Sequence, residues 1–240
     1  GPSGTRAGRL AIAPVFESRA LMLVDFERVR IRLVRPGTNE VVIDTTVLFP
    51  AGADSLALSL SVPVQGSGEV FSLSLAMVNA VGDTVFRGGP TDIQVQPGIP
   101  NMAPTQTPMR YTGVGASAAS VRFVAPAAVA FFGDTTLFTA EALDSAGTVI
   151  PNTPIVFSVA DTTMARVPNP AVGRVVAKTV RGTVEVRASL LTPPVARTTL
   201  TIQPRPTTLA ISSGNNQTGT VGAALGQPLT ALVGAADGSV

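Results

Sequence analysis

Residues 135–143 read T-T-L-F-T-A-E-A-L, and this stretch decides the fold class. Phe138, Ala140 and Ala142 recur at a spacing of two residues, and Thr139 and Glu141 occupy the positions between them. Because successive side chains of a β-strand point to opposite faces, this alternation predicts a strand with one buried face. Residues 144–147, D-S-A-G, have the composition of a turn and are expected to end the strand.

The same alternation continues as far as residue 203. Further strands are expected over residues 154–159, 175–177, 183–188 and 198–203, with a short one carried by Met164, Ala165 and Val167. The side chains expected to face inward in the last two long strands are Val184, Val186, Ala188, Leu200 and Ile202. Short strands separated by turns about every 8–12 residues predict a β-sandwich.

The residues of this module resemble the bacterial immunoglobulin-like domain family, group 2, which is found in invasin- and intimin-like surface proteins. The resemblance rests on Phe138 to Asp144 with Gly147, Val156 and Phe157, Asp161 with Ala165 and Val167, Gly173, and Gly182 to Val186. Phe157 stands where the family often has Trp, and Phe fills that core position with less area and no N–H to satisfy. The resemblance implies a sandwich fold but does not fix a ligand.

Residues 1–97 predict another sandwich, of immunoglobulin or fibronectin type, from pattern alone. Its expected strands cover residues 10–14, 25–34, 40–49, 55–62, 69–79, 84–87 and 91–96. The side chains expected to face inward in the strands at 55–62 and 69–79 are Leu56, Leu58, Leu60, Val62, Phe71, Leu73, Leu75 and Met77. In the strand at 25–34, Arg28, Arg30 and Arg32 alternate with Val29, Ile31 and Leu33. The arginines are interpreted as a solvated outer face. The alternative is a cationic stripe for an anionic polysaccharide or surface.

Two junctions divide the chain. Residues 98–119 are rich in Pro, Gly and Ala and are expected to form a linker of limited flexibility, followed by the immunoglobulin-like domain at 120–204. Tyr111 is the only tyrosine, and we expect it to pack at this junction. Pro204 and Pro206 enclose Arg205, so this second junction is predicted to be stiff.

Residues 205–240 predict an incomplete immunoglobulin-like domain or a set of donated strands. Strands are expected at 209–211 and 228–233, and the intervening polar stretch resembles the opening of a bacterial immunoglobulin-like domain closer to group 1. So few strands cannot bury a core by themselves. Leu209, Ile211, Leu229 and Leu232 are therefore the candidate subunit-contact residues.

Composition excludes several kinds of chemistry. The 240 residues include no Cys, His or Trp, which removes thiolate and imidazole catalysts and metal ligands. Asp134, Asp144, Asp161 and Asp237 lie in turn sequences, and we interpret them as turn-bonding residues; the alternative is a calcium site. No cofactor, metal or catalytic residue is expected. The arginines are spread over separate strands, so no nucleic-acid partner is expected, and no apolar run is long enough to cross a membrane.

These observations predict an all-β chain of tandem immunoglobulin-like β-sandwich domains without enzymatic activity. The expected role is structural or adhesive at the bacterial cell surface or outside the cell, as a stalk, adhesin shaft or filament subunit. Expected partners are other copies of the chain or neighbouring domains of the same protein, with a surface glycan or a cell receptor as a further partner. The alternative role is a carbohydrate-binding or accessory region of a larger secreted enzyme.

Overall fold

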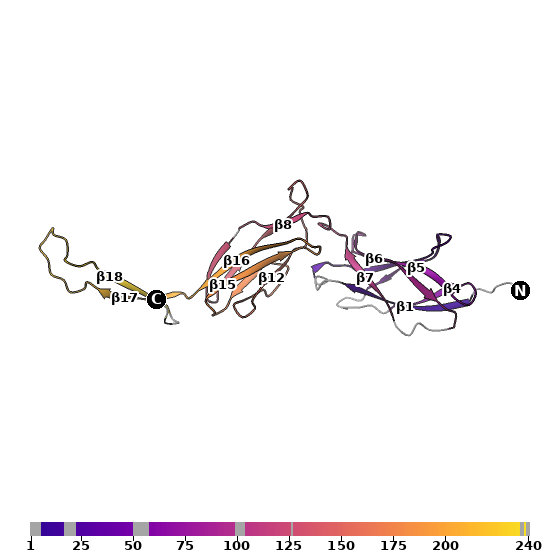
Figure 1. Ribbon diagram of the computed structural model, residues 1–240, viewed down its shortest axis with the longest axis horizontal. Helices are drawn as coiled ribbons and strands as arrows, with labels where there is room; N and C mark the ends of the chain where they lie inside the picture. The colour runs from indigo at the N-terminus through magenta and orange to yellow at the C-terminus, as the bar shows by residue number, and fades with distance from the viewer. Residues whose placement is uncertain are drawn as a thin grey trace. The chain divides into compact units, whose positions relative to one another are not determined.

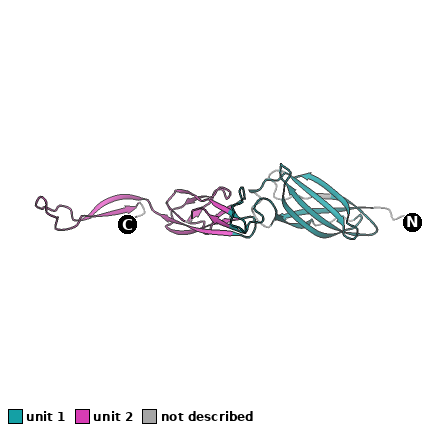
Figure 2. Ribbon diagram, turned by 90° about the horizontal axis from the view of Figure 1, so that it is seen from above, with its two compact units in different colours: residues 1–120, 142–155, 190–194 teal, residues 121–141, 156–189, 195–240 magenta. Residues whose placement is uncertain are grey.

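The computed structural model describes residues 6–16, 23–49, 58–98, 104–125, 127–235 and 238. These residues form strands, turns and loops and no α-helix, which confirms the predicted all-β class. Contacts group the chain into two compact units, shown in teal and magenta in Figure 2. Unit 1 comprises residues 1–120, 142–155 and 190–194, and unit 2 comprises residues 121–141, 156–189 and 195–240.

Unit 1 is built on a seven-stranded sheet in the order β3-β2-β5-β6-β7-β1-β4. Its strands are β1 (Arg6–Phe16), β2 (Arg28–Arg35), β3 (Glu40–Leu48), β4 (Leu58–Val64), β5 (Glu69–Val78), β6 (Thr84–Val95) and β7 (Thr105–Tyr111). All neighbours are antiparallel except β1 and β7, which run parallel. The turn at residues 36–39 joins β2 to β3, and Asn39 there has a positive φ of 58°.

A single hydrophobic cluster fills unit 1. Side chains from β1 and β4 lie in the same cluster as side chains from β2, β5 and β6, so the sheet folds over and encloses one core between its two halves. The predicted inward residues of β2 and β5 are all buried: Val29, Ile31, Leu33, Phe71, Leu73, Leu75 and Met77. Of the inward residues predicted for 55–62, Val62 is buried and Leu60 is half-buried, while Leu56 and the side chain of Leu58 lie outside the described residues.

Strand β7 differs from the sequence analysis, which placed residues 98–119 in a linker. Its first half pairs with β1 and its second half with β6, and the partner changes at Met109. Pro108 lies beside this change of partner, where a missing N–H is easier to accommodate than in the middle of a continuous ladder. Tyr111, at the end of β7, is buried against Phe86 and donates a hydrogen bond from its hydroxyl to the carbonyl oxygen of Val114 at 2.9 Å, which confirms it as a packing residue.

The described residues between 120 and 204, called the second sandwich below, form three sheets. A four-stranded sheet has the order β12-β15-β16-β9, a three-stranded sheet has the order β10-β14-β13, and β11 pairs with β8. The strands are β8 (Ser120–Phe123), β9 (Ala127–Phe131), β10 (Thr135–Leu137), β11 (Ala140–Leu143), β12 (Val156–Val159), β13 (Ala165–Arg166), β14 (Arg174–Ala177), β15 (Gly182–Ser189) and β16 (Val195–Gln203). In Figure 1, β12, β15 and β16 lie side by side.

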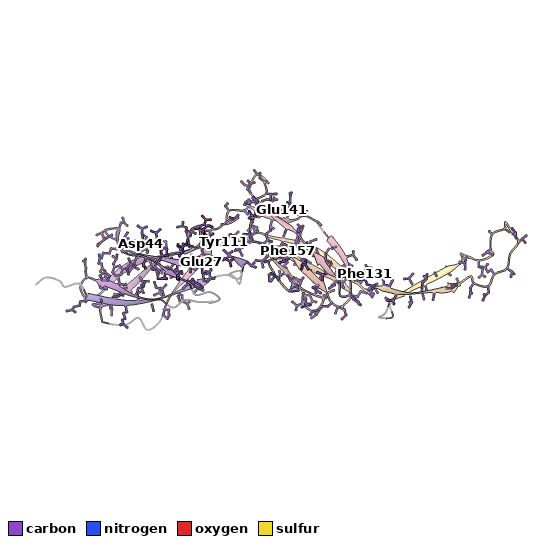
Figure 3. The ribbon with its side chains drawn as sticks, turned by 180° about the vertical axis from the view of Figure 1, so that it is seen from behind. Glu27, Asp44, Tyr111, Phe131, Glu141 and Phe157 are labelled. Carbon is purple, nitrogen blue, oxygen red and sulfur yellow. The ribbon has the colours of Figure 1, made fainter. Side chains whose placement is uncertain are left out.

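Aromatic contacts connect these sheets. The Phe123 ring lies 5.8 Å from that of Phe138 and 6.3 Å from that of Phe157, between centroids. Phe157, labelled in Figure 3, is buried and therefore occupies a core position, as expected. The inward residues predicted for β15 and β16, Val184, Val186, Ala188, Leu200 and Ile202, are also buried.

The stretch 135–143 departs from the single strand that its alternation predicts. Residues 138 and 139 interrupt it, so β10 pairs with β14 whereas β11 pairs with β8. Phe138 and Ala142 are buried as predicted, but Ala140 is only half-buried. The two-residue alternation indicates which side chains face inward, but it does not show where a strand changes its partner in the sheet.

Candidate subunit-contact surface

The candidate subunit-contact residues lie in or beside a two-stranded sheet formed by β17 (Pro206–Ser213) and β18 (Thr230–Ala235), labelled in Figure 1. The strands are antiparallel, and we call residues 206–235 the hairpin. Register shifts, which are β-bulges or similar irregularities, occur between Pro206 and Thr208 and between Ile211 and Ser213. Every residue of β17 is exposed, as are the first four residues of β18.

The pairing register divides the candidate residues between the two faces of the hairpin. Leu209 pairs with Val233 and Ile211 pairs with Ala231, so these four side chains share one face, because directly paired residues point to the same side. Leu232 pairs with Ala210 and therefore belongs to the opposite face. The exposed fractions are 74% for Leu209, 62% for Ile211, 50% for Val233 and 48% for Leu232. The structure thus brings Leu209 and Ile211 together and separates them from Leu232.

Leu229 lies in the loop of the hairpin and not in its strands, and it is 64% exposed. One side chain closes this loop. The Gln217 amide nitrogen Nε2 donates to the carbonyl oxygens of Gly214 and Gln227, both at 2.7 Å, and its Oε1 accepts from the Gln227 N–H at 2.8 Å. Ser213 and Thr230 also bond to each other through their hydroxyls at the loop's base. These contacts hold the loop ends together without contributing a hydrophobic core.

The junction before the hairpin is held by Arg205. Its guanidinium forms an ion pair with Asp134 at 2.7 Å and stacks on the ring of Phe131, 4.9 Å from the centroid. Phe131, labelled in Figure 3, ends β9, and Asp134 also accepts a hydrogen bond from the Phe131 N–H. Asp134 was predicted to be a turn-bonding residue. It fills that role and also binds the junction arginine.

The other predicted turn-bonding residues behave similarly where they are described. Asp144 Oδ1 accepts from the backbone N–H groups of Ala146 and Thr148, at 2.8 and 2.9 Å. Asp161 Oδ1 accepts from the N–H and hydroxyl of Thr163, at 2.7 and 2.6 Å. Asp237 lies outside the described residues. In the part of the chain that the structure describes, no group of three or more His, Cys, Asp or Glu could hold a metal ion.

The carboxylates with perturbed acidity favour the charged form. Hydrogen bonding from Arg35 lowers the pKa of Glu69, hydrogen bonding from Arg30 lowers that of Asp44, and Arg187 does the same for Glu185. The Thr163 hydroxyl lowers the pKa of Asp161. A general acid that works near neutral pH needs a raised pKa, so these four groups are suited to ion pairing and turn bonding and unsuited to proton donation.

The arginines of β2 lie on its outer face, as the sequence analysis interprets them. Arg28, Arg30 and Arg32 face outward, and Arg30 forms a two-point ion pair with Asp44 of β3, with both N–O distances 2.7 Å. The sequence analysis did not find that Arg87 of β6 and Arg110 of β7 lie on the same face as these arginines. Their position relative to β2 depends on the β2–β5, β5–β6 and β6–β7 pairings, which join segments far apart in the sequence. The sequence analysis also missed Val233 of the hairpin and the loop-closing Gln217.

No family model and no curated protein matches the chain. Among solved structures, domains 4–9 of the surface layer protein SbsC align with 88% of this chain and 28% of that one, at 10% identity and a TM-score of 0.32. Human CDH23 EC21-23 aligns over 95% of this chain and 80% of that one, at 13% identity and a TM-score of 0.29.

The D00-D0 domain of Intimin aligns over 85% of this chain and 87% of that one, at 12% identity and a TM-score of 0.27. Similarities at this level do not decide between functions. The chain also spans much less than two thirds of the SbsC fragment. The bacterial immunoglobulin-like resemblance therefore stays a sequence-based prediction. The described part of the chain contains no helix with the length and hydrophobicity that a bilayer crossing requires.

Proposed function

We propose that this chain is a non-enzymatic structural or adhesive protein of the bacterial cell surface, and that it assembles by strand pairing through the hairpin. The observation that carries the proposal is the hairpin itself, an ordered two-stranded sheet whose large apolar side chains are exposed on both faces. The bacterial and extracellular setting rests on the sequence resemblance.

The energetics of such a hairpin favour a partner. An isolated two-stranded sheet in water is marginally stable at best. Among the described residues, β17 pairs only with β18, so each strand keeps one edge with unpaired N–H and C=O groups. Edges of this kind template pairing with another strand, and the exposed side chains of Leu209, Ile211 and Val233 would be buried by a sheet packed on their face.

The second sandwich offers edges that could receive the hairpin. Natural sheets protect their edges with charge or proline. The unit 1 edge strands follow this rule, since β3 carries Glu40 and Asp44 and β4 carries Pro63. By contrast, β9 (A-A-V-A-F) and β12 (V-F-S-V) are edge strands without charge or proline. We infer that β9 or β12 of another copy, or of a neighbouring domain, is the receiving edge.

A glycan-binding role through aromatic stacking has less support. Stacking platforms need an exposed aromatic ring. The chain has no Trp, and its single Tyr, Tyr111, is buried in unit 1. The rings of Phe138 and Phe157 are buried as well.

The proposal is tested by measuring molecular mass against concentration for the full chain, together with limited proteolysis of the hairpin. Strand pairing between copies predicts a mass that rises with concentration and a hairpin that becomes protease-resistant over the same range. A chain that stays monomeric at high concentration while its hairpin already resists protease would contradict self-assembly. Val129→Lys, on the exposed face of β9, tests that edge: a β9 receiver predicts weaker assembly, and an unchanged mass leaves β12 as the receiver.

A further inference from the structure

Strand register gathers arginines from three separate strands onto the outer face of the unit 1 sheet. Arg30 of β2 pairs with Ala76 of β5, Ala76 pairs with Arg87 of β6, and Arg87 pairs with Arg110 of β7. Directly paired residues point to the same side of a sheet, so the three arginines form one row across the strands. Arg28 and Arg32 extend the row along β2, because residues two apart share a face.

This row is strongly cationic. Arg30, Arg32, Arg87 and Arg110 are exposed and Arg28 is half-buried. Asp44 lies on the same face, and Arg30 engages it through two hydrogen bonds of 2.7 Å. Arg87 and Arg110 are direct cross-strand neighbours, and like charges in that position repel. Within the described residues, neither forms an ion pair.

Arg28, Arg30, Arg32 and Arg87 border a groove with a floor of small residues, and Arg110 is the cross-strand neighbour of Arg87 outside its lining. Ser74 and Ala76 of β5 and Gly88 of β6 form this floor, and the open hollow above them has a volume of about 1000 Å³. Thr46 and Thr84 add hydroxyl groups at its sides. We call this feature the arginine groove. Every residue that lines it belongs to unit 1.

We propose that the arginine groove binds an acidic polysaccharide through the carboxylates of its uronic acid residues. Guanidinium groups pair with carboxylates in a two-point geometry, and Arg30 already shows that geometry with Asp44 in this groove. A ligand carboxylate between Arg87 and Arg110 would relieve their repulsion. The serine and threonine hydroxyls can bond to sugar hydroxyls along the floor.

The spacing of the charges suits a chain with intermittent acidic groups. Arg30 and Arg87 are two strand steps apart, about 10 Å, and Arg28 and Arg32 are about 13 Å apart along β2. An acidic polysaccharide carries its carboxylates at intervals of one or two sugar rings, and these intervals match the distances between the arginines. A planar membrane surface would meet the rims of the groove but not its floor.

Nucleic acid is less well matched. Single-stranded nucleic acids are held by aromatic side chains on which bases stack, and no aromatic residue lines the arginine groove. The formal net charge of the whole chain is only +2, so long-range attraction for a densely charged polymer is weak. Binding must therefore come from the local arrangement of the groove.

The test measures the binding of oligogalacturonate to the full chain by calorimetry, at low and at physiological salt. Arg87→Gln with Arg110→Gln should weaken binding about tenfold, because two exposed charge contacts are lost. The matched control is Arg166→Gln with Arg174→Gln, two exposed arginines of unit 2, which removes the same charge elsewhere. Asp44→Asn should strengthen binding about threefold, since it frees Arg30 for the ligand.

Four results would overturn the proposal: no binding of oligogalacturonate by the unmodified chain, an equal loss in the control pair, tighter binding of a heparin oligosaccharide, or tighter binding of a DNA oligonucleotide of similar length. The third would replace carboxylates by sulfates as the ligand chemistry, and the fourth would replace the glycan by nucleic acid. Thermal unfolding guards against a folding artefact. The Arg87 and Arg110 variant should melt no lower than the unmodified chain, because it removes a cross-strand repulsion.

Discussion

Replacing Leu209 and Ile211 by Thr should strongly weaken assembly while leaving the folded monomer unchanged. Thr has the β-branched shape that strands favour, and it removes most of the apolar surface. Burying a Leu or Ile side chain contributes about 1.5–3 kcal/mol. Since 74% of Leu209 and 62% of Ile211 are exposed, an interface that covers both would gain about 2–4 kcal/mol from them. Losing that energy weakens association about 30-fold to several-hundred-fold.

Sedimentation velocity over a range of concentrations measures the effect, with thermal unfolding as a check on the monomer. The matched control is Leu48→Thr with Val124→Thr, whose side chains are 76% and 58% exposed but lie outside the hairpin. The control should assemble like the unmodified chain. If the hairpin variant associates as strongly as the control, or if both lose association equally, the hairpin is not the contact surface.

Three further predictions concern the two units. Glu69→Gln should cost about 1–2 kcal/mol of stability at pH 7, because it removes the ion pair with Arg35. The folded pKa of Glu69 lies below its ordinary value of 4.5, so the stability difference is present above about pH 4.5 and should vanish as the pH falls through the folded pKa. Denaturant titrations at several pH values measure this. Gly173→Ala should destabilise unit 2 by about 2 kcal/mol or more in denaturant unfolding, because φ is +68° there and the added Cβ would overlap the carbonyl oxygen of Phe138; an unchanged midpoint would refute this packing. Thr107→Val should stabilise unit 1 by about 1 kcal/mol in thermal unfolding, since the Thr107 hydroxyl is buried with no hydrogen-bond partner in the described residues; a loss of stability would reveal a partner for that hydroxyl.

The sequence predicts much of the fold because inward and outward residues alternate so regularly. Val29, Ile31 and Leu33 in β2 and Val184, Val186 and Ala188 in β15 are buried where the pattern places them. Strands whose sequence mixes apolar, polar and proline residues are harder to predict. In β7, Thr107, Met109 and Tyr111 alternate with exposed residues, but a buried threonine and the neighbouring prolines obscured the strand.

The surfaces were less predictable than the cores, because they depend on which strands pair. Leu209 and Ile211 could be named in advance, because the two or three strands predicted within residues 205–240 cannot bury a core by themselves. Their separation from Leu232 depends on the register of the hairpin. The arginine groove depends on three registers at once, and no local pattern shows that Arg30, Arg87 and Arg110 share a row.

Amide hydrogen exchange of the full chain at low and high concentration tests the central claim most directly. Strand pairing by the hairpin predicts that amides in β17 and β18 exchange quickly in dilute solution and become protected as concentration rises. Amides in β5 and β15, which already have two strand neighbours, should not change. Hairpin amides that exchange at the same rate at both concentrations, in a sample whose mass has increased, would contradict the claim, because assembly would then proceed through another surface.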